Sequence, residues 1–199
     1  LDDIKELDFK FKNFAIEACP NITFLKIEIE DTISDYKDEL RDFFVDLENN
    51  KNNFFTDVSN YISYETGQPT HCYDFEKING KFSFKSTQDD HEFETLLDSK
   101  IKLKDENYVF AIENKIVNLA GIVGDKSTSC SDNTRSVLVE CAFFNPEIII
   151  GKSLKYDIKS DAAHKFERGV DPNNQEKCLR RFISIIDKHA KIKNIELIN

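Results

Sequence analysis

The hydrophobic residues near the start of the chain fall into two short runs of the kind that forms β-strands. These runs cover residues 9–18 and 22–30. Between them stand Cys19, Pro20 and Asn21, and proline and asparagine both favour turn conformations. We therefore expect a hairpin, or two neighbouring strands, at the N-terminal end of the fold.

The next segment carries its apolar residues at helical spacing. Over residues 35–48 they recur three or four positions apart among charged residues, as Tyr36, Leu40, Phe43, Phe44 and Leu47. A polar break at 49–53 follows, and a second short helix is expected over 57–65. The pattern predicts two successive helices separated by a loop.

The pattern in the middle of the chain predicts a series of short strands. Loops rich in aspartate, asparagine, serine and glycine separate runs of β-branched and aromatic residues. The expected strands cover 81–86, 101–104, 108–112, 116–122 and 136–144.

A long helix is predicted near the C-terminus. Asp171 suits its cap, Pro172 its first turn, and an apolar stripe runs to about residue 191. A short strand over 195–198 follows. The whole pattern predicts an α+β fold: a single domain with a mixed, largely antiparallel β core, flanked by helices and the long C-terminal helix.

The composition narrows the setting in which the chain works. A chain of 199 residues is long enough to form a hydrophobic core without the help of disulfide bonds. Its five cysteines are odd in number, widely spaced and without a C-x-x-C pair, so neither a disulfide framework nor a zinc cluster is indicated. With no apolar run approaching about 18 residues, no membrane partner is expected. We expect a reducing, cytoplasmic setting, and the Leu1 start without any methionine suggests a piece of a longer protein.

The net charge of -10 argues against broad, non-specific binding of nucleic acid. The segment 152–181 is the exception, because it holds eight Lys or Arg against five Asp or Glu. An anionic ligand is expected to meet this segment. The alternative is an ordinary solvated helix face of mixed charge.

Several familiar chemistries find no support in the sequence. It contains no G-x-S-x-G, no Walker loop, no G-x-G-x-x-G after a strand and no H-E-x-x-H. The four histidines are far apart in sequence, so a metal cluster would need nearly all of them. We expect neither metal nor nucleotide chemistry within this chain.

The segment from Ser160 to Pro172 crowds polar, aromatic, glycine and proline residues without a helical or strand period. It is poorly explained by core packing, and we interpret it as part of a site. Four further motifs precede it in order, and the five read Asp57-Val-Ser-Asn-Tyr61, Thr66-Gly-Gln-Pro-Thr-His-Cys-Tyr-Asp74, Leu119-Ala-Gly-Ile-Val-Gly-Asp125, Leu138-Val-Glu-Cys-Ala-Phe-Phe-Asn-Pro146 and Ser160-Asp-Ala-Ala-His-Lys-Phe-Glu-Arg-Gly-Val-Asp-Pro172.

On these motifs the chain resembles the editing domain of the bacterial phenylalanyl-tRNA synthetase beta subunit, over about residues 9–190. The resemblance implies that residues 1–199 are a domain of a longer subunit in an α2β2 enzyme, with tRNA(Phe) and the alpha subunit as partners. The parent enzyme would charge tRNA(Phe) using ATP and Mg2+, with no cofactor in this domain. The domain itself would hydrolyse Tyr-tRNA(Phe), because a pocket built for an apolar ring rejects an added hydroxyl only about 100-fold.

The resemblance also assigns roles to the residues that would select the substrate. Glu140 and the backbone of Gly124 would meet the tyrosine hydroxyl, the ionised carboxylate accepting its proton and the N–H donating in return. A carboxylate at a strand end and a simple turn glycine are the alternatives. His71 would hold or relay a proton near the ester, unless it is only a structural histidine.

Other residues would shape the same pocket. Ser59 and Asn60 would orient the water or the ester carbonyl, although Ser59 could instead cap the second helix. Ser160 and Ala162 would form the pocket wall. The stretch around Phe166 is expected to be architectural, while Lys165 and Arg168 would also meet the acceptor end of the tRNA.

The sequence departs from the family pattern at several of these positions. Asp125 replaces a glycine, and we expect it to repel Glu140 or narrow the pocket. Serine stands for threonine at 59 and 160, lysine for arginine at 165, and residues 49–53 lack the usual R-P-I-N-N. We therefore expect a weakened site. The alternatives are a scaffold that contacts tRNA without catalysis, and a free-standing relative with another substrate.

Overall fold

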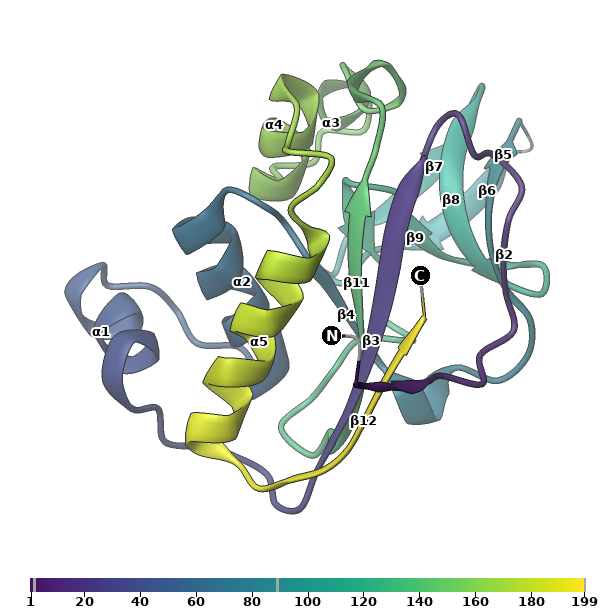
Figure 1. Cartoon of the computed structure of the whole chain (residues 1–199). Helices are drawn as coiled ribbons and strands as arrows, with labels where there is room; N and C mark the ends of the chain where they lie inside the picture. The colour runs from purple at the N-terminus through teal and green to yellow at the C-terminus, as the bar shows by residue number, and fades with distance from the viewer. Residues whose placement is uncertain (2, 89, 199) are drawn as a thin grey trace.

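The structure is a computed structural model that describes every residue except 2, 89 and 199. Two β-sheets pack face to face, and helices cover the outer face of the first (Figure 1). The main helices are α1 (Asp38–Asp46), α2 (Phe54–Thr66) and α5 (Gln175–His189), with the shorter α3 (Lys152–Lys155) and α4 (Asp161–Arg168) at one end. The expected α+β class is confirmed.

The first sheet has the strand order β1-β12-β3-β11-β4, and all its pairings are antiparallel except β1 with β12. Strand β11 lies between β3 and the edge strand β4 and is buried along nearly its whole length. The strands are β1 (Lys5–Glu6), β3 (Asn21–Ile29), β4 (His71–Asp74), β11 (Ser136–Phe143) and β12 (Ile192–Ile198).

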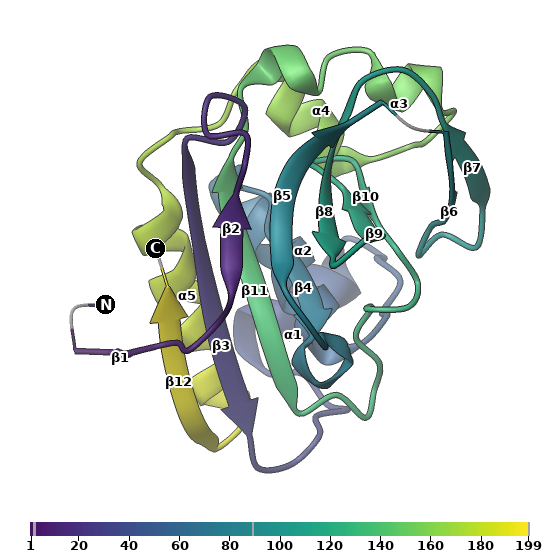
Figure 2. The same cartoon turned by 90° about the vertical axis from the view of Figure 1, so that its right-hand side faces the viewer.

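The second sheet has the order β10-β9-β8-β5-β2, antiparallel except for β2 with β5 (Figure 2). A separate hairpin pairs β6 (His91–Glu94) with β7 (Lys100–Leu103). The strands of the second sheet are β2 (Phe11–Asn13), β5 (Phe82–Thr87), β8 (Asn107–Ile112), β9 (Lys115–Leu119) and β10 (Val123–Gly124).

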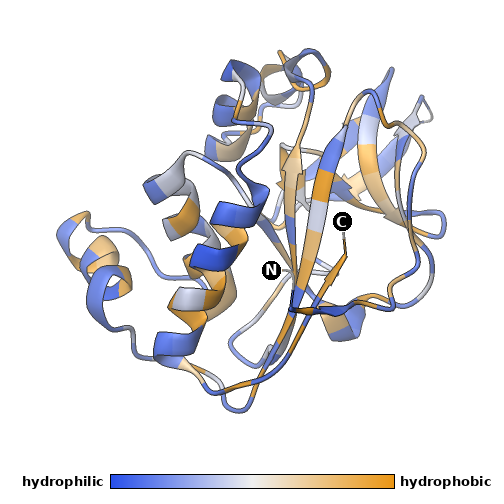
Figure 3. Ribbon diagram, viewed as in Figure 1, coloured by the Kyte–Doolittle hydropathy of each residue, from blue (hydrophilic) through white to orange (hydrophobic). Residues whose placement is uncertain are grey.

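The alternation of side chains along β11 separates two hydrophobic cores. Val137, Val139 and Cys141 face the helices, whereas Leu138 and Ala142 face the second sheet. Figure 3 shows hydrophobic residues, in orange, along the inner strands and on the sides of the helices that face the sheet. Residue 140 shares the parity of 138 and 142, so its side chain projects toward the second sheet.

The prediction of a hairpin at residues 9–30 is wrong, because β2 and β3 belong to different sheets. Their residues meet face to face instead, with the ring centroids of Phe11 and Phe24 4.8 Å apart. The hydrophobic pattern identifies a strand but carries no information about its partner. The strands β4 and β6 were not predicted from the sequence.

The segment 160–172 contains a helix, α4, rather than the non-periodic turn that we expected. This helix has two turns and buries only Ala163 and Phe166, which is too few apolar positions to show a period. Helix α2 begins at residue 54, earlier than predicted, because the Asn53 side chain accepts a hydrogen bond from the Thr56 amide at 3.1 Å. Helix α5 begins only at residue 175.

The predicted strand over 116–122 is too long, because β9 ends at Leu119 and β10 begins only at Val123. Gly121 lies between them with a φ of 68°, in the left-handed region that favours glycine. The interruption turns the chain back so that Gly124 pairs with Asn118. This turn brings β10 to the end of β4, where the candidate site is found.

Candidate functional site

An open cavity of about 390 Å³ lies where α2, β4, β10 and the start of α4 meet. We call it the outer cavity. Six of the seven residues that the resemblance assigned to catalysis or substrate binding line it: Ser59, Asn60, His71, Gly124, Ser160 and Ala162. Segments far apart in the sequence are thus brought to one place.

A smaller space of about 50 Å³, the inner pocket, lies against the outer cavity and is lined by Glu140, the seventh residue. His71, Gly124 and Ala162 line both spaces. A water molecule occupies about 30 Å³ in the liquid, so the inner pocket has room for about one or two waters. A phenol ring requires more space than this.

Glu140 is held in the middle of β11, directly opposite His71 of β4 and only 4% exposed. Its Oε2 accepts a hydrogen bond from the Tyr73 hydroxyl at 2.7 Å, and that hydroxyl accepts one from Asn118 Nδ2 at 2.8 Å. Burial raises the pKa of Glu140 to about 8. The carboxyl is therefore mostly protonated at pH 7, whereas we had expected an ionised one.

The His71 ring fills the boundary between the outer cavity and the inner pocket. It meets the Tyr73 ring edge to face, with centroids 4.4 Å apart. Burial lowers the pKa of His71 to about 4, and the nearby Asp125 charge opposes this shift in part. The imidazole is therefore neutral at pH 7, and it is a weaker base than a solvent-exposed histidine.

Gly124 lies in strand β10 and has no positive φ, so the simple turn glycine is not what the structure shows. A Cβ at position 124 would lie 2.4 Å from His71 Cε1 and 2.7 Å from its Nε2. Its carbonyl accepts a hydrogen bond from the Leu96 amide at 2.9 Å. The missing side chain therefore allows the close approach of the His71 ring.

Ser59 lies within α2 and does not cap it, because Asn53 takes that position. Its hydroxyl donates to the Thr70 carbonyl at 2.7 Å and lies 2.8 Å from Thr70 Oγ1. These bonds hold α2 against the residue that precedes His71. The next residue, Asn60, is exposed in the wall of the outer cavity.

Ser160 is the N-cap of α4 and uses its hydroxyl twice. It accepts a hydrogen bond from the Ala163 amide at 3.1 Å and donates to the Ile122 carbonyl at 2.7 Å. The second bond ties α4 to the turn before β10. As a result Ser160 and Ala162 form one wall of the outer cavity.

The two residues expected at the tRNA end are bonded within the fold. Lys165 donates to the Ser63 carbonyl at 2.6 Å and to its hydroxyl at 2.7 Å, which joins α4 to α2. Arg168 bonds His164 Nδ1 at 2.7 Å on its own helix. Neither residue lines the outer cavity.

Asp125 does not act as we expected. Its carboxylate is 6% exposed and accepts hydrogen bonds from the Ser127 hydroxyl, the Thr128 amide and the Thr128 hydroxyl at 2.7, 3.0 and 2.9 Å. Lys115 forms an ion pair with it at 3.4 Å. The side chain lines neither the outer cavity nor the inner pocket, so the expectation that it narrows the pocket is wrong.

Several residues that line the outer cavity were not predicted from the sequence. Asn52 and Asn53 lie in the segment whose departure from the family pattern we had noted, and Thr70 is within the second motif. Lys159 also lines the outer cavity, as its single lysine, and it directly precedes the fifth motif. These residues could have been predicted from their positions, because each lies within a motif or close to one in the sequence.

Two other kinds of feature are absent from the part of the chain that the structure describes. Over residues 1–199, with 2, 89 and 199 left aside, no three His, Cys, Asp or Glu side chains are grouped so that they could hold a metal ion. In the same part of the chain no helix is long and apolar enough to cross a membrane.

The chain is similar to known proteins over most of its length. The B3/4 domain family matches residues 18–191. The phenylalanine–tRNA ligase beta subunit of Francisella tularensis is 36% identical over 132 residues, which are 66% of this chain and 17% of that protein. The same subunit of Legionella pneumophila is 38% identical over 127 residues, 64% of this chain and 16% of that protein.

A solved structure shares the fold. An N-terminal fragment of the phenylalanyl-tRNA synthetase beta subunit from Pyrococcus horikoshii superposes with a TM-score of 0.56 at 10% sequence identity. The match covers 98% of this chain and 52% of that one. The chain spans about one sixth of the length of the bacterial relatives, as their covered shares of 17% and 16% show.

Proposed function

The chain belongs to the B3/4 domain family, and from this membership we propose that it hydrolyses the ester of Tyr-tRNA(Phe) within a phenylalanine–tRNA ligase beta subunit. The parent ligase would use ATP and Mg2+ and would pair this subunit with an alpha subunit. The observation that supports the proposal best is the position of His71. It lies opposite Glu140 across two strands and lines both the outer cavity and the inner pocket.

The proposed reaction is an attack of water on the ester carbonyl in the outer cavity. Neutral His71 accepts a proton from the water as the new carbon–oxygen bond forms, and the proton then passes to the ribose oxygen as the old bond breaks. The Ser59 hydroxyl is already bonded to Thr70, which disfavours a covalent serine intermediate. Asn60 is available to orient the carbonyl.

Selection for tyrosine would come from the inner pocket. The substrate hydroxyl would replace the waters near Glu140 and share that carboxyl with Tyr73. Phenylalanine would bring no hydroxyl to bond the carboxyl, and a hydrogen bond not made at a buried polar group costs about 1 to 3 kcal/mol. A ring can enter only when the side chains between the two spaces move apart, because the inner pocket is about 50 Å³ as it stands.

One observation favours a second candidate, a domain that contacts tRNA and does not hydrolyse it. In the structure the inner pocket is closed to a ring, and the Glu140 carboxyl already bonds Tyr73. If this arrangement persists with substrate present, a tyrosyl side chain can occupy the outer cavity but its hydroxyl cannot reach Glu140. The two candidates differ in a single measurable property, the rate of deacylation.

The test is single-turnover deacylation of Tyr-tRNA(Phe), with the protein in excess so that weak binding does not limit the rate. We expect the wild-type protein to accelerate hydrolysis and His71→Ala to reduce it to the uncatalysed rate. His164→Ala is the matched control, since His164 is exposed on α4 and lies outside the cavity lining. No acceleration by the wild-type protein would favour the scaffold.

A further inference from the structure

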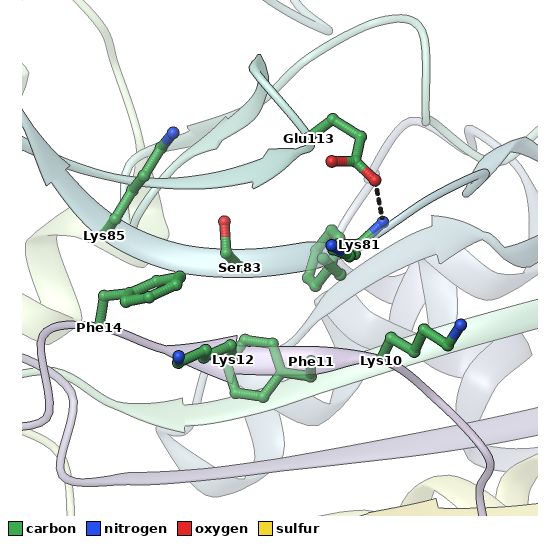
Figure 4. Close-up of a pocket in the computed structure, with 9 residues that line it drawn as sticks. Lys10, Phe11, Lys12, Phe14, Lys81, Ser83, Lys85 and Glu113 are labelled. Atoms are coloured by element: carbon green, nitrogen blue, oxygen red, sulfur yellow. Dashed lines mark hydrogen bonds between the residues drawn. The ribbon is translucent and has the colours of Figure 1, made fainter.

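A separate and larger cavity, of about 620 Å³, lies along β2 and β5 of the second sheet. It shares no lining residue with the outer cavity. Figure 4 shows lysine side chains from both strands around it, with Phe14 at one end. We call it the lysine groove, and its lining consists of Lys10, Phe11, Lys12, Phe14, Lys81, Phe82, Ser83, Lys85 and Glu113.

The charge of this groove is opposite to that of the chain. Four lysines and one glutamate line it, although the chain as a whole carries a net charge of -10. None of the four lysines forms an ion pair with any residue that the structure describes. The Glu113 carboxylate accepts a hydrogen bond from the backbone amide of Lys81 at 2.9 Å (Figure 4).

The strand register places these positive charges next to one another. Lys12 lies opposite Ser83 in the parallel pairing of β2 with β5, and Lys85 follows two residues later on the same face. Lys10 and Lys81 directly precede another pair of opposed residues. Like charges at neighbouring positions of adjacent strands destabilise a sheet, so an anion bound across them would stabilise this one.

An exposed aromatic ring accompanies the lysines. Phe14 is 61% exposed, and Lys12 Nζ lies 4.7 Å from the centroid of its ring. The Phe14 backbone is fixed by a hydrogen bond from its amide to the Phe84 carbonyl at 2.9 Å. Proteins that bind single-stranded nucleic acid combine these two features, a positively charged groove for phosphates and aromatic rings on which bases stack.

In the segment 152–181, where we had expected an anionic ligand, three of the eight lysines and arginines form ion pairs with residues that the structure describes. Lys155 pairs with Asp105, Arg180 with Glu176, and Arg181 with both Glu39 and Glu65. Lys165 is bonded to Ser63, as described above. The groove lysines differ in that four of them lie together on or beside two adjacent strands, with no ion-pair partner among the described residues.

We propose that the lysine groove binds single-stranded RNA, with phosphates on the four lysines and a base stacked on Phe14. This site is distinct from the hydrolytic site, and it does not depend on whether the protein deacylates tRNA. The favoured ligand is nucleic acid rather than an acidic peptide, because an exposed aromatic ring provides a stacking surface that every base can use.

The test is fluorescence anisotropy of labelled octaadenylate titrated with the 199-residue chain at two salt concentrations. For single strands the logarithm of affinity falls with the logarithm of salt concentration at a slope of about -0.7 per phosphate contact. Four contacts therefore predict that affinity falls about 50-fold from about 50 to about 200 mM salt. The double variant Lys12→Gln/Lys85→Gln should show a fall of only about 7-fold, since about two contacts remain.

Two further variants separate the groove from general charge. Phe14→Ala should weaken binding about tenfold or more, because it removes a stacking surface. The double variant Lys37→Gln/Lys177→Gln makes the same change in net charge at exposed lysines outside the groove, and should bind like the wild type.

Three results would overturn the proposal. They are equal weakening by the two double variants, equal binding of an eight-base-pair duplex, and displacement of the RNA by an octaglutamate peptide at the same concentration as by unlabelled octaadenylate. The first would indicate non-specific attraction, the second a site that needs no unstacked base, and the third an acidic-peptide site.

Discussion

Glu140→Gln should abolish a pH dependence of stability that the wild-type protein carries. Burial raises the pKa of Glu140 from 4.5 to about 8, so the folded state holds a proton that the unfolded state has released. This contribution to stability is complete below pH 4.5 and is lost as the pH rises to about 8. At about 1.36 kcal/mol for each pH unit, the loss amounts to at most about 5 kcal/mol.

Urea unfolding of the two proteins from about pH 5 to about pH 9 measures this directly. Glutamine keeps an acceptor for the Tyr73 hydroxyl and cannot ionise, and all other titrating groups cancel in the difference between the two proteins. The wild type should lose free energy of unfolding relative to the variant as the pH rises. The exposed Glu147, changed to glutamine, serves as the control and should show no such trend. A constant difference between wild type and Glu140→Gln would refute the buried, protonated carboxyl.

Three other substitutions test the geometry of the site. Gly124→Ala should displace the His71 ring, since the new Cβ would lie 2.4 Å from its Cε1; we expect deacylation to fall at least about tenfold with an unchanged circular dichroism spectrum. Asp125→Ala removes the acceptor of three hydrogen bonds and should lower the free energy of unfolding by about 2 to 3 kcal/mol in urea, whereas little change would mean that the Thr128 loop is held by other contacts. Ser160→Ala removes a helix cap and should cost about 1 to 2 kcal/mol by thermal unfolding; a stability equal to the wild type would show that the cap is dispensable.

Local patterns in the sequence predicted most elements of the fold, but not their pairing. The nearly continuous run of apolar residues in 136–144 identified β11, because a strand with neighbours on both sides and packing on both faces is buried throughout. The same pattern could not show that β2 pairs with β5 and not with β3. Pairing depends on contacts between segments that are distant in sequence, and hydrophobic periodicity does not record them.

The residues of the site could be predicted only through the ordered motifs. Six of the assigned residues line one cavity, although they come from four separate segments of the chain. What the motifs could not show was the state of each side chain. The hydrogen bond from Tyr73 to Glu140 and the burial that keeps the carboxyl neutral depend on packing in three dimensions. The same holds for Asp125, whose role as an acceptor within its own loop requires the turn geometry.

The lysine groove illustrates a related limit. The lysines at 10 and 12 lie on β2 or next to it, and those at 81 and 85 on β5 or next to it, so the two pairs are about 70 positions apart in the sequence. The number of charged residues along the sequence pointed to 152–181 instead. Such a count includes lysines and arginines whose charge is neutralised by an ion pair in the folded protein. Only the parallel pairing of β2 with β5 brings the unpaired lysines together.

The selectivity of deacylation tests the central claim most directly. The measurement is the ratio of kcat/KM for Tyr-tRNA(Phe) to that for Phe-tRNA(Phe), for the wild-type protein and for Glu140→Ala. If Glu140 recognises the tyrosine hydroxyl, the wild-type ratio should be well above one, and the variant should lose about 10-fold or more of it, as expected for a buried hydrogen bond to a polar group. An unchanged ratio in the variant would contradict the account, since the hydroxyl would then be recognised elsewhere or not at all.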